Sequence, residues 1–270
     1  MKCPNCQAEL EPNAKFCTEC GTRIESRAPE GAPQAMKAVT DTGIVLGKKA
    51  REARLTAVVD PSAIISDRAY NLTIVAVLLY GLLVNYLLCR FVGVAVFTIN
   101  PIVLLIGYLV LAFAGIMIAA KSQNPWISFL GYNMVVVPFG LVICLMVEYY
   151  GGIGSSVVTY AFLYTMLISV GMFACVLIAP GFFAKLGGAL GGVLIGLIFC
   201  EIILLIFHVD QIVTDWIAAG LFSLYIGYDI YRSQQFPKTL DNAVDSALDI
   251  YMDIANLFIR ILSIMGKKDN

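Results

Sequence analysis

The stretch that decides the fold is residues 241–260, which read DNAVDSALDIYMDIANLFIR. Four aspartates recur in it at steps of four residues, and Arg260 follows seven residues after the last of them. Because four residues of α-helix turn by about 400°, these acids share one slowly rotating face. The sequence therefore predicts an apolar helix over residues 242–265 with a single acidic face, formed by Asp241, Asp245, Asp249 and Asp253.

The composition of the whole chain excludes a water-soluble globular protein. Of its 270 residues, 59% are hydrophobic and 14% are charged, whereas soluble domains average about 45–50% apolar and about 25% charged residues. The mean hydropathy is +0.83. A net charge of −1 with a single histidine, His208, provides no basic surface for nucleic acid. The lipid bilayer is therefore the expected surrounding of most of the chain, and no nucleic acid is expected as a partner.

Seven segments are apolar over the roughly 20 residues that a helix needs to cross the hydrocarbon core. The sequence thus predicts an all-α membrane protein with seven transmembrane helices. In the fifth segment, Gly188 and Gly192 have the spacing that lets another helix backbone come close. The seven segments are residues 71–91, 99–120, 126–147, 156–179, 183–207, 211–231 and 242–265.

Basic residues indicate how the chain is oriented in the membrane. A basic patch at residues 48–54, KKAREAR, precedes the first segment, and no apolar signal sequence comes before it. Such a patch holds its end of a span on the cytoplasmic side, so we expect a multi-pass protein of the cell membrane with a cytoplasmic N-terminus. Seven crossings place Lys267 and Lys268 outside, against the same rule. The alternative is a last segment that enters the bilayer without crossing it.

The first twenty residues contain two Cys-x2-Cys pairs separated by ten residues. Each pair forms a tight turn that directs two thiolates at one point, and two such turns complete the tetrahedral four-sulfur shell that Zn²⁺ favours. With all four positions filled by sulfur, the expected zinc ion is structural, because no position remains for water or substrate. The predicted ligands are Cys3, Cys6, Cys17 and Cys20.

The chain is expected to divide into three parts. Residues 1–25 form the zinc ribbon. Residues 26–68 form a linker, rich in Pro, Gly and Ala near its start, that ends in the basic patch. Residues 69–266 form the seven-helix transmembrane domain. The zinc ribbon suggests a protein partner outside the membrane, which the sequence does not identify.

Acidic residues inside apolar segments mark function by default, since ionised groups are expensive in hydrocarbon. Asp229 ends the sixth segment, and a short connection makes that segment an antiparallel neighbour of the helix that carries Asp253. Two carboxyl groups at close range in a low dielectric share a proton. That proton blocks a cation, whereas its loss exposes oxygen ligands suited to Ca²⁺.

Two further interpretations of the acids stay open. The first alternative is that three of the acids are interfacial residues in headgroup water, namely Asp229, Asp241 and Asp245. This alternative fits Asp253 less well. Asp249 extends the predicted ion pathway, and Glu201 in the fifth segment is either a further ligand or gate of it or a residue at the outer interface.

The last two segments resemble the Bax-inhibitor family, the transmembrane Bax inhibitor motif proteins. The resemblance is carried by FSLYIGYD at residues 222–229 and by ALDIYMDIANLF at residues 247–258. It extends more generally over residues 70–265, whereas the zinc ribbon lies outside the family core. The resemblance implies seven helices with the last one central, surrounded by the other six. It also implies a pH-sensitive calcium leak governed by an aspartate pair that matches Asp229 and Asp253.

Some members of that family carry a basic residue on the second span that latches onto one of the two acids. The nearest match in this chain is Lys121, although its local sequence, AAKS at residues 119–122, aligns poorly. We therefore treat Lys121 as a possible latch only.

The sequence is consistent with a transporting or a non-transporting membrane protein. The leading hypothesis is a pH-sensitive calcium leak channel, and the alternative is a non-transporting membrane scaffold whose zinc ribbon binds a partner such as a membrane protease. An enzyme is not expected. Residues 251–253 lack the Gly-x-Gly-Asp motif of aspartyl intramembrane proteases, and the chain has no Gly-x-Ser-Gly nucleophile with a membrane-buried histidine.

Overall fold

The computed structural model describes residues 59–207, 209 and 211–268 of the chain. Within this described part, seven helices have 20 residues or more, and three shorter helices link or precede them. The long helices are α3 (Asp67–Phe91), α4 (Pro101–Lys121), α5 (Pro125–Tyr149), α6 (Ser156–Ile178), α8 (Gly187–Ile206), α9 (Ile212–Ser233) and α10 (Leu240–Lys268). The short ones are η1 (Pro61–Ala63), η2 (Gly93–Thr98) and α7 (Pro180–Ala184).

Polar caps determine where the first four long helices begin. The side chains of Ser66, Asn100, Asn124 and Ser155 accept hydrogen bonds from backbone N–H groups in the first turns of α3, α4, α5 and α6. These N–H groups have no partner within the helix, and a cap of this kind stabilises a helix by about 1 kcal/mol. In α4 and α5 a proline follows the cap, where its fixed φ suits the first turn.

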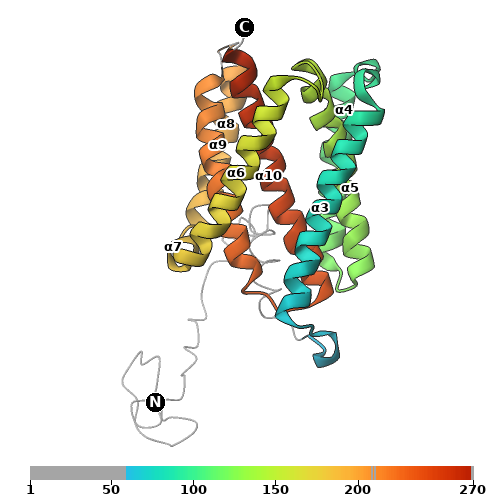
Figure 1. Ribbon diagram of the computed structural model, residues 1–270, viewed down its shortest axis with the longest axis vertical. Coiled ribbons are helices and arrows are strands. Elements are labelled where there is room, and N and C mark those ends of the chain that lie inside the picture. The colour runs from blue at the N-terminus through green and yellow to red at the C-terminus, as the bar shows by residue number, and fades with distance from the viewer. Residues whose placement is uncertain (1–58, 208, 210, 269–270) are drawn as a thin grey trace, which may run out of the picture. The chain divides into compact units, whose positions relative to one another are not determined.

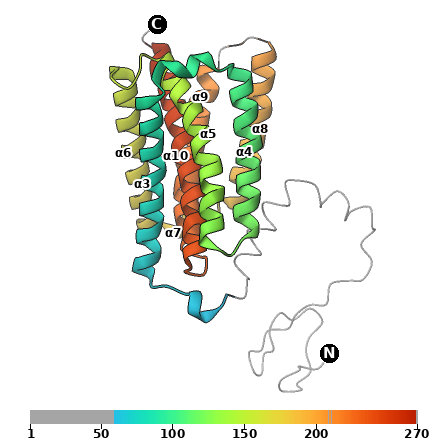
Figure 2. The same ribbon diagram turned by 90° about the vertical axis from the view of Figure 1, so that its right-hand side faces the viewer.

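The long helices run side by side along one axis, with α10 on the inside (Figures 1 and 2). α10 packs against α3, α5, α6 and α9, whereas α4 packs on α5 and α8 packs on α9. The last helix is thus central and packs against four of the other six long helices. The resemblance implied six neighbours, but α5 and α9 separate α10 from α4 and α8. We call the end where α3 and α10 begin the lower end, and the end where α10 finishes the upper end (Figure 1).

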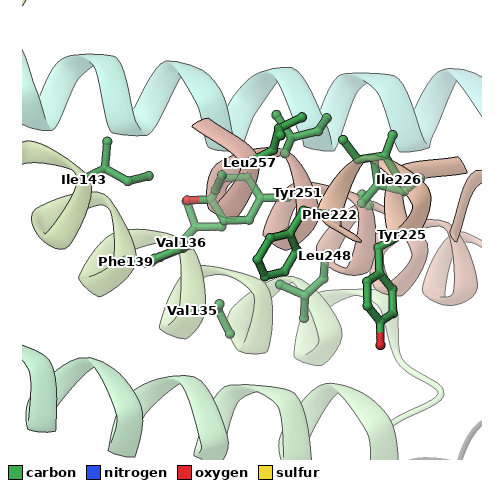
Figure 3. Packing of buried hydrophobic residues seen from close by; sticks show 14 of the residues in the cluster. Val135, Val136, Phe139, Ile143, Phe222, Tyr225, Ile226, Leu248, Tyr251 and Leu257 are labelled. Atoms are coloured by element: carbon green, nitrogen blue, oxygen red, sulfur yellow. The ribbon is translucent and has the colours of Figure 1, made fainter. Parts of the chain in front are cut away.

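Aromatic residues fill the space between α5 and α10. Tyr251 of α10 is fully buried and meets Phe139 of α5 edge-on, with ring centroids 6.4 Å apart. Figure 3 shows these two rings beside Val136 and Leu248. The amide Nδ2 of Asn85 on α3 donates a hydrogen bond of 2.7 Å to the Tyr251 hydroxyl. A buried hydroxyl requires such a partner, so this contact also ties α3 to α10.

The outward faces of the bundle are apolar. Large hydrophobic side chains such as Leu83, Phe113 and Leu167 are exposed along α3, α4 and α6. By length and composition, α3, α4, α5, α6 and α8 are suited to cross a membrane, which makes five candidate spans among the described residues. The chain is therefore a multi-pass helical membrane protein. Crossing by α9 and α10, which the sequence-based count of seven requires, remains a prediction.

Glycine allows a close approach of two helices between α4 and α5. A Cβ on Gly115 of α4 would lie 2.5 Å from the carbonyl oxygen of Gly131 on α5. Around Gly188 and Gly192 of α8 there is open space, with no atom within 4 Å of an added Cβ. No helix of the described chain takes that place beside α8, because small-residue spacing permits a close contact but does not supply the partner helix.

The α4–α5 contact predicts how two glycines of the same helix differ. Replacing Gly115 by Val should lower the free energy of unfolding by about 1–3 kcal/mol, because the added carbons meet the backbone of α5. Gly107→Val is the matched control, since a Cβ there meets no atom within 4 Å. Thermal unfolding in detergent measures both variants, and equal midpoints would contradict the proposed packing.

Candidate functional site

Helices α9 and α10 form an antiparallel pair that supplies most of the buried charge in the described structure. The connection between them is only residues 234–239, so the end of α9 lies beside the first half of α10. Asp229 and Arg232 face inward from α9, and Asp253 does so from α10. All three side chains are buried, which places ionisable groups within the protein and away from lipid.

Arg232 joins the two helices in a group that we call the lower cluster, consisting of Arg232, Asp229, Asp249 and Asp253. Arg232 Nη1 donates to Asp229 Oδ1 at 3.1 Å, one turn earlier in α9. Arg232 Nη2 donates to Asp249 Oδ2 on α10 at 2.6 Å. The side chains of Arg232 and Asp229 are each only 8% exposed, so these contacts replace the water that the guanidinium has lost.

Asp253 completes the lower cluster through Asp229. Its carboxyl group is within hydrogen-bonding contact of the Asp229 carboxyl. It also interacts electrostatically with Asp249 and Arg232. Two carboxyl groups in such contact need a proton between them, because two carboxylates offer acceptors only. The second oxygen of Asp253, Oδ2, is buried without a hydrogen-bond partner among the described residues.

The charges of the lower cluster do not cancel. With one proton shared by Asp229 and Asp253, that pair carries −1, Asp249 carries −1 and Arg232 carries +1, which leaves a net charge of −1. Asp249 is the most exposed member, with a side chain 28% exposed. The cluster therefore places two buried carboxyl groups beside a third that is partly exposed.

Earlier along α10, Asp241 and Asp245 are buried as well. Ser128 Oγ of α5 donates a hydrogen bond of 2.6 Å to Asp241 Oδ1. Both acids thus lie against neighbouring protein, as does Asp229, and not at an exposed rim of the bundle. The acidic face predicted from the four-residue spacing is turned toward the interior.

Glu201 lies in a separate group, the upper cluster, which consists of Arg260, Glu201, Asp215 and Ser263. Arg260 Nη1 lies 2.6 Å from Glu201 Oε1 and 2.9 Å from Asp215 Oδ1, and its Nη2 donates to Glu201 Oε2 at 2.8 Å. Ser263 Oγ donates to Asp215 Oδ2 at 2.9 Å. The structure brings together Asp229, Asp249 and Asp253 from the predicted site, whereas Glu201 is paired with Arg260 nearer the upper end.

The cation beside Asp229 comes from a different helix than the resemblance suggested. Lys121, the possible latch, is the exposed last residue of α4. The guanidinium that contacts Asp229 belongs to Arg232, which the sequence did not single out as a site residue. The spacing Asp229-x2-Arg232 could have indicated the pair, because side chains three residues apart are neighbours on a helix.

The four cysteines of the predicted zinc site, Cys3, Cys6, Cys17 and Cys20, lie outside the described residues. Within the described residues, no group of three His, Cys, Asp or Glu side chains is arranged to hold a metal ion. The lower cluster is therefore not a preformed metal site.

Fold and site together define a multi-pass helical membrane protein whose innermost helix carries charge clusters bridged by arginine. Comparison with known families agrees with this class. Residues 64–270 match the model described as Inhibitor of apoptosis-promoting Bax1, so the chain belongs to the Bax inhibitor family, and the resemblance of its last two helices is confirmed. Residues 2–24 match a zinc-ribbon domain, which is also as predicted.

The chain is similar to two uncharacterized proteins of Helicobacter pylori, from strains 26695 and J99. Each is 38% identical over 86 residues. That match covers 31% of this chain and 36% of the relative's length, so the chain matches about a third of either relative.

The lower cluster predicts a large effect of removing its only cation. Arg232→Gln should lower the free energy of unfolding by about 3 kcal/mol, because the buried carboxylate of Asp229 and the partly exposed one of Asp249 lose their partner. Unfolding in detergent micelles measures the change. Arg68→Gln is the control at the same end of the bundle, where the exposed side chain should contribute less than about 0.5 kcal/mol.

Proposed function

We propose that this protein is a pH-sensitive calcium leak channel in which the Asp229–Asp253 pair is the gate. The observation that carries the proposal is the contact between these two carboxyl groups inside the bundle. Acids that touch within a membrane protein respond to pH as a unit, because proton loss places two negative charges side by side. Membership of the Bax inhibitor family supports the same function.

In the closed state the shared proton holds α9 and α10 together. The proton links Asp229 to Asp253, and Arg232 links Asp229 to Asp249. The guanidinium also lies over the rings of Tyr228 and Phe236, at 5.8 and 5.4 Å from their centroids. A cation that enters from the lower end meets two helices held together and a pair that offers few free oxygens, so it does not pass.

Loss of the proton changes both the charge and the packing. The net charge of the lower cluster becomes −2, and repulsion between the two carboxylates pushes α9 and α10 apart. The freed oxygens of Asp229, Asp253 and Asp249 are hard ligands, which suit Ca²⁺ better than softer metals. Because the described residues hold no preformed metal site, the ion is expected to pass and not to remain.

Calcium flux into liposomes tests this function. Wild-type protein in dye-loaded vesicles should admit Ca²⁺ faster at neutral than at acidic pH, with at most about a tenfold change per pH unit, because a single proton is released. Asp253→Asn should show low flux at every pH, since an amide in this position cannot ionise. Flux is read from the dye after Ca²⁺ is added outside.

Asp60→Asn is the matched control for that experiment. Asp60 is fully exposed before α3, and hydrogen bonds from the backbone N–H and the hydroxyl of Ser62 lower its pKa. It therefore stays ionised throughout the pH range used, and its replacement should leave the pH profile unchanged. A wild-type flux that is absent, or that Asp253→Asn leaves pH-dependent, would refute the gate.

The zinc-ribbon match at residues 2–24 supports a structural zinc ion held by the two Cys-x2-Cys pairs. Purified protein should contain a single zinc ion per chain by elemental analysis. Cys17→Ser should release the metal, because three thiolates no longer complete the tetrahedral shell. Cys175→Ser on α6 is the control, and retention of zinc by the Cys17 variant would count against the site.

The zinc ribbon also favours a second function, a membrane scaffold that does not transport ions. In that case residues 2–24 bind a protein partner, such as a membrane protease, and α3 to α10 serve as the anchor. We place the N-terminus in the cytoplasm and the protein in the cell membrane under both functions, because the basic patch precedes the first span. The liposome experiment separates the two, since a scaffold gives no flux at any pH.

A further inference from the structure

A cavity lies between α3 and α6 in the upper half of the bundle. Its volume is about 320 Å³, and its walls are mainly apolar. Ligand sites in proteins are often cavities of roughly 300–1,000 Å³ with mainly apolar walls. α3 and α6 make no extensive packing contact with each other, whereas α10 packs against both, and Figure 1 shows α10 between them. The cavity is therefore a groove between two helices, with α10 as part of its floor.

The floor of this groove is buried and its rim is exposed. Ile143 of α5 and Ala255 of α10 belong to the floor and are 5% and 2% exposed. Tyr86 of α3 and Phe162 of α6 form the rim and are 53% and 54% exposed. Beyond the rim, both helices carry exposed apolar side chains, and both are suited to cross a membrane. The groove therefore opens toward hydrocarbon and continues the surface that faces the bilayer.

The groove begins near the membrane surface and points into the bilayer. Its residues come from the final turns of α3 and the first turns of α6, which both lie at the upper end. From Val158 to Met166 of α6 the groove follows about 12 Å of helix axis. This length is less than half of the roughly 30 Å hydrocarbon core. The groove thus lies within one leaflet.

A basic side chain lies at the surface end of the groove. Arg90 is exposed in the last turn of α3, four residues after the rim residue Tyr86, so the two side chains are neighbours on the helix. The carboxylate of Glu148 at this end lies beside the turn at Gly152, and Arg90 forms no ion pair with any residue that the structure describes. A phosphodiester group is complementary to a free guanidinium. A cation at the surface above an apolar groove matches the order of groups in a phospholipid.

We propose that the groove between α3 and α6 binds one acyl chain of a phospholipid from the adjoining leaflet, with the phosphodiester at Arg90. The hydrophobic effect does not drive this binding, because the surrounding lipid is as apolar as the groove. The gain comes from contacts, since an empty cavity leaves its lining side chains without neighbouring atoms on one side and a flexible chain supplies them. The site does not depend on the leak function.

A photoreactive phospholipid tests the site in liposomes. The probe is a phosphatidylcholine that carries a diazirine in one acyl chain, and mass spectrometry locates the cross-linked peptides. In the wild-type protein the label should concentrate on residues 82–89 of α3 and 158–166 of α6. Label spread evenly over the exposed faces of α3, α4 and α6 would overturn the proposal, because that pattern is expected of lipid that merely surrounds the protein.

Two tryptophan substitutions on α6 form a matched pair. Val158 lines the groove and is 7% exposed, so Val158→Trp should fill the groove and lower its label at least about tenfold. Val170 is 62% exposed and lies outside the groove, so Val170→Trp should leave the label near the wild-type level. Thermal unfolding in detergent shows whether each variant is folded, and Cys89→Phe fills the groove from α3 if Val158→Trp is not. Undiminished label in a folded groove-filling variant would refute the site.

Arg90→Gln tests the contact with the phosphodiester. It should lower the label in the groove without moving it to other peptides, and an unchanged amount of label would exclude Arg90 from the site. Two other occupants are separated by the same experiment. If two copies of the chain cross-link through residues 82–89 while the lipid leaves no label there, the groove is an interface between copies. If a photoreactive fatty acid labels the groove and the phospholipid does not, the occupant is a free fatty acid. Either result overturns the proposal.

Discussion

A guanidinium group that is removed from water needs carboxylate partners, and this requirement determines how the helices are arranged around α10. Arg232 and Arg260 each bridge acids that come from different helices. In a low dielectric such contacts are short and directional, and losing one partner leaves a buried charge without compensation. The two arginines therefore fix the position of α9 relative to α10 along the helix axis. Arg260 also links α8 to this pair.

The same constraint explains why the most polar helix lies inside the bundle. α10 carries four aspartates on one face and cannot present them to hydrocarbon. α3, α5, α6 and α9 cover it, and their outward faces carry the exposed aliphatic and aromatic side chains. α4 and α8, whose exposed faces are mostly apolar, occupy the periphery. The order of the layers thus follows the polarity of the helices.

Which charged side chains pair in the site depends on distances in space, and the spacing of residues along the sequence does not give these distances. The antiparallel relation of α9 and α10 could be inferred because only a short connection joins them, so the meeting of Asp229 and Asp253 was within reach of sequence reasoning. The pairing of Glu201 with Arg260 was not, since 59 residues separate them. Arg232 was overlooked because a basic residue at a helix end fits the topology rule equally well.

The sequence by itself determined that the chain is a helical membrane protein of the Bax inhibitor family with a zinc-ribbon sequence at its start. It did so because hydropathy, the four-residue spacing of the aspartates and the Cys-x2-Cys pairs are local properties of the chain. The tertiary structure alone decided which helices surround α10, where glycines touch and which acids share each arginine. Those features depend on the packing of helices far apart in sequence, where a few ångströms decide whether two charges pair.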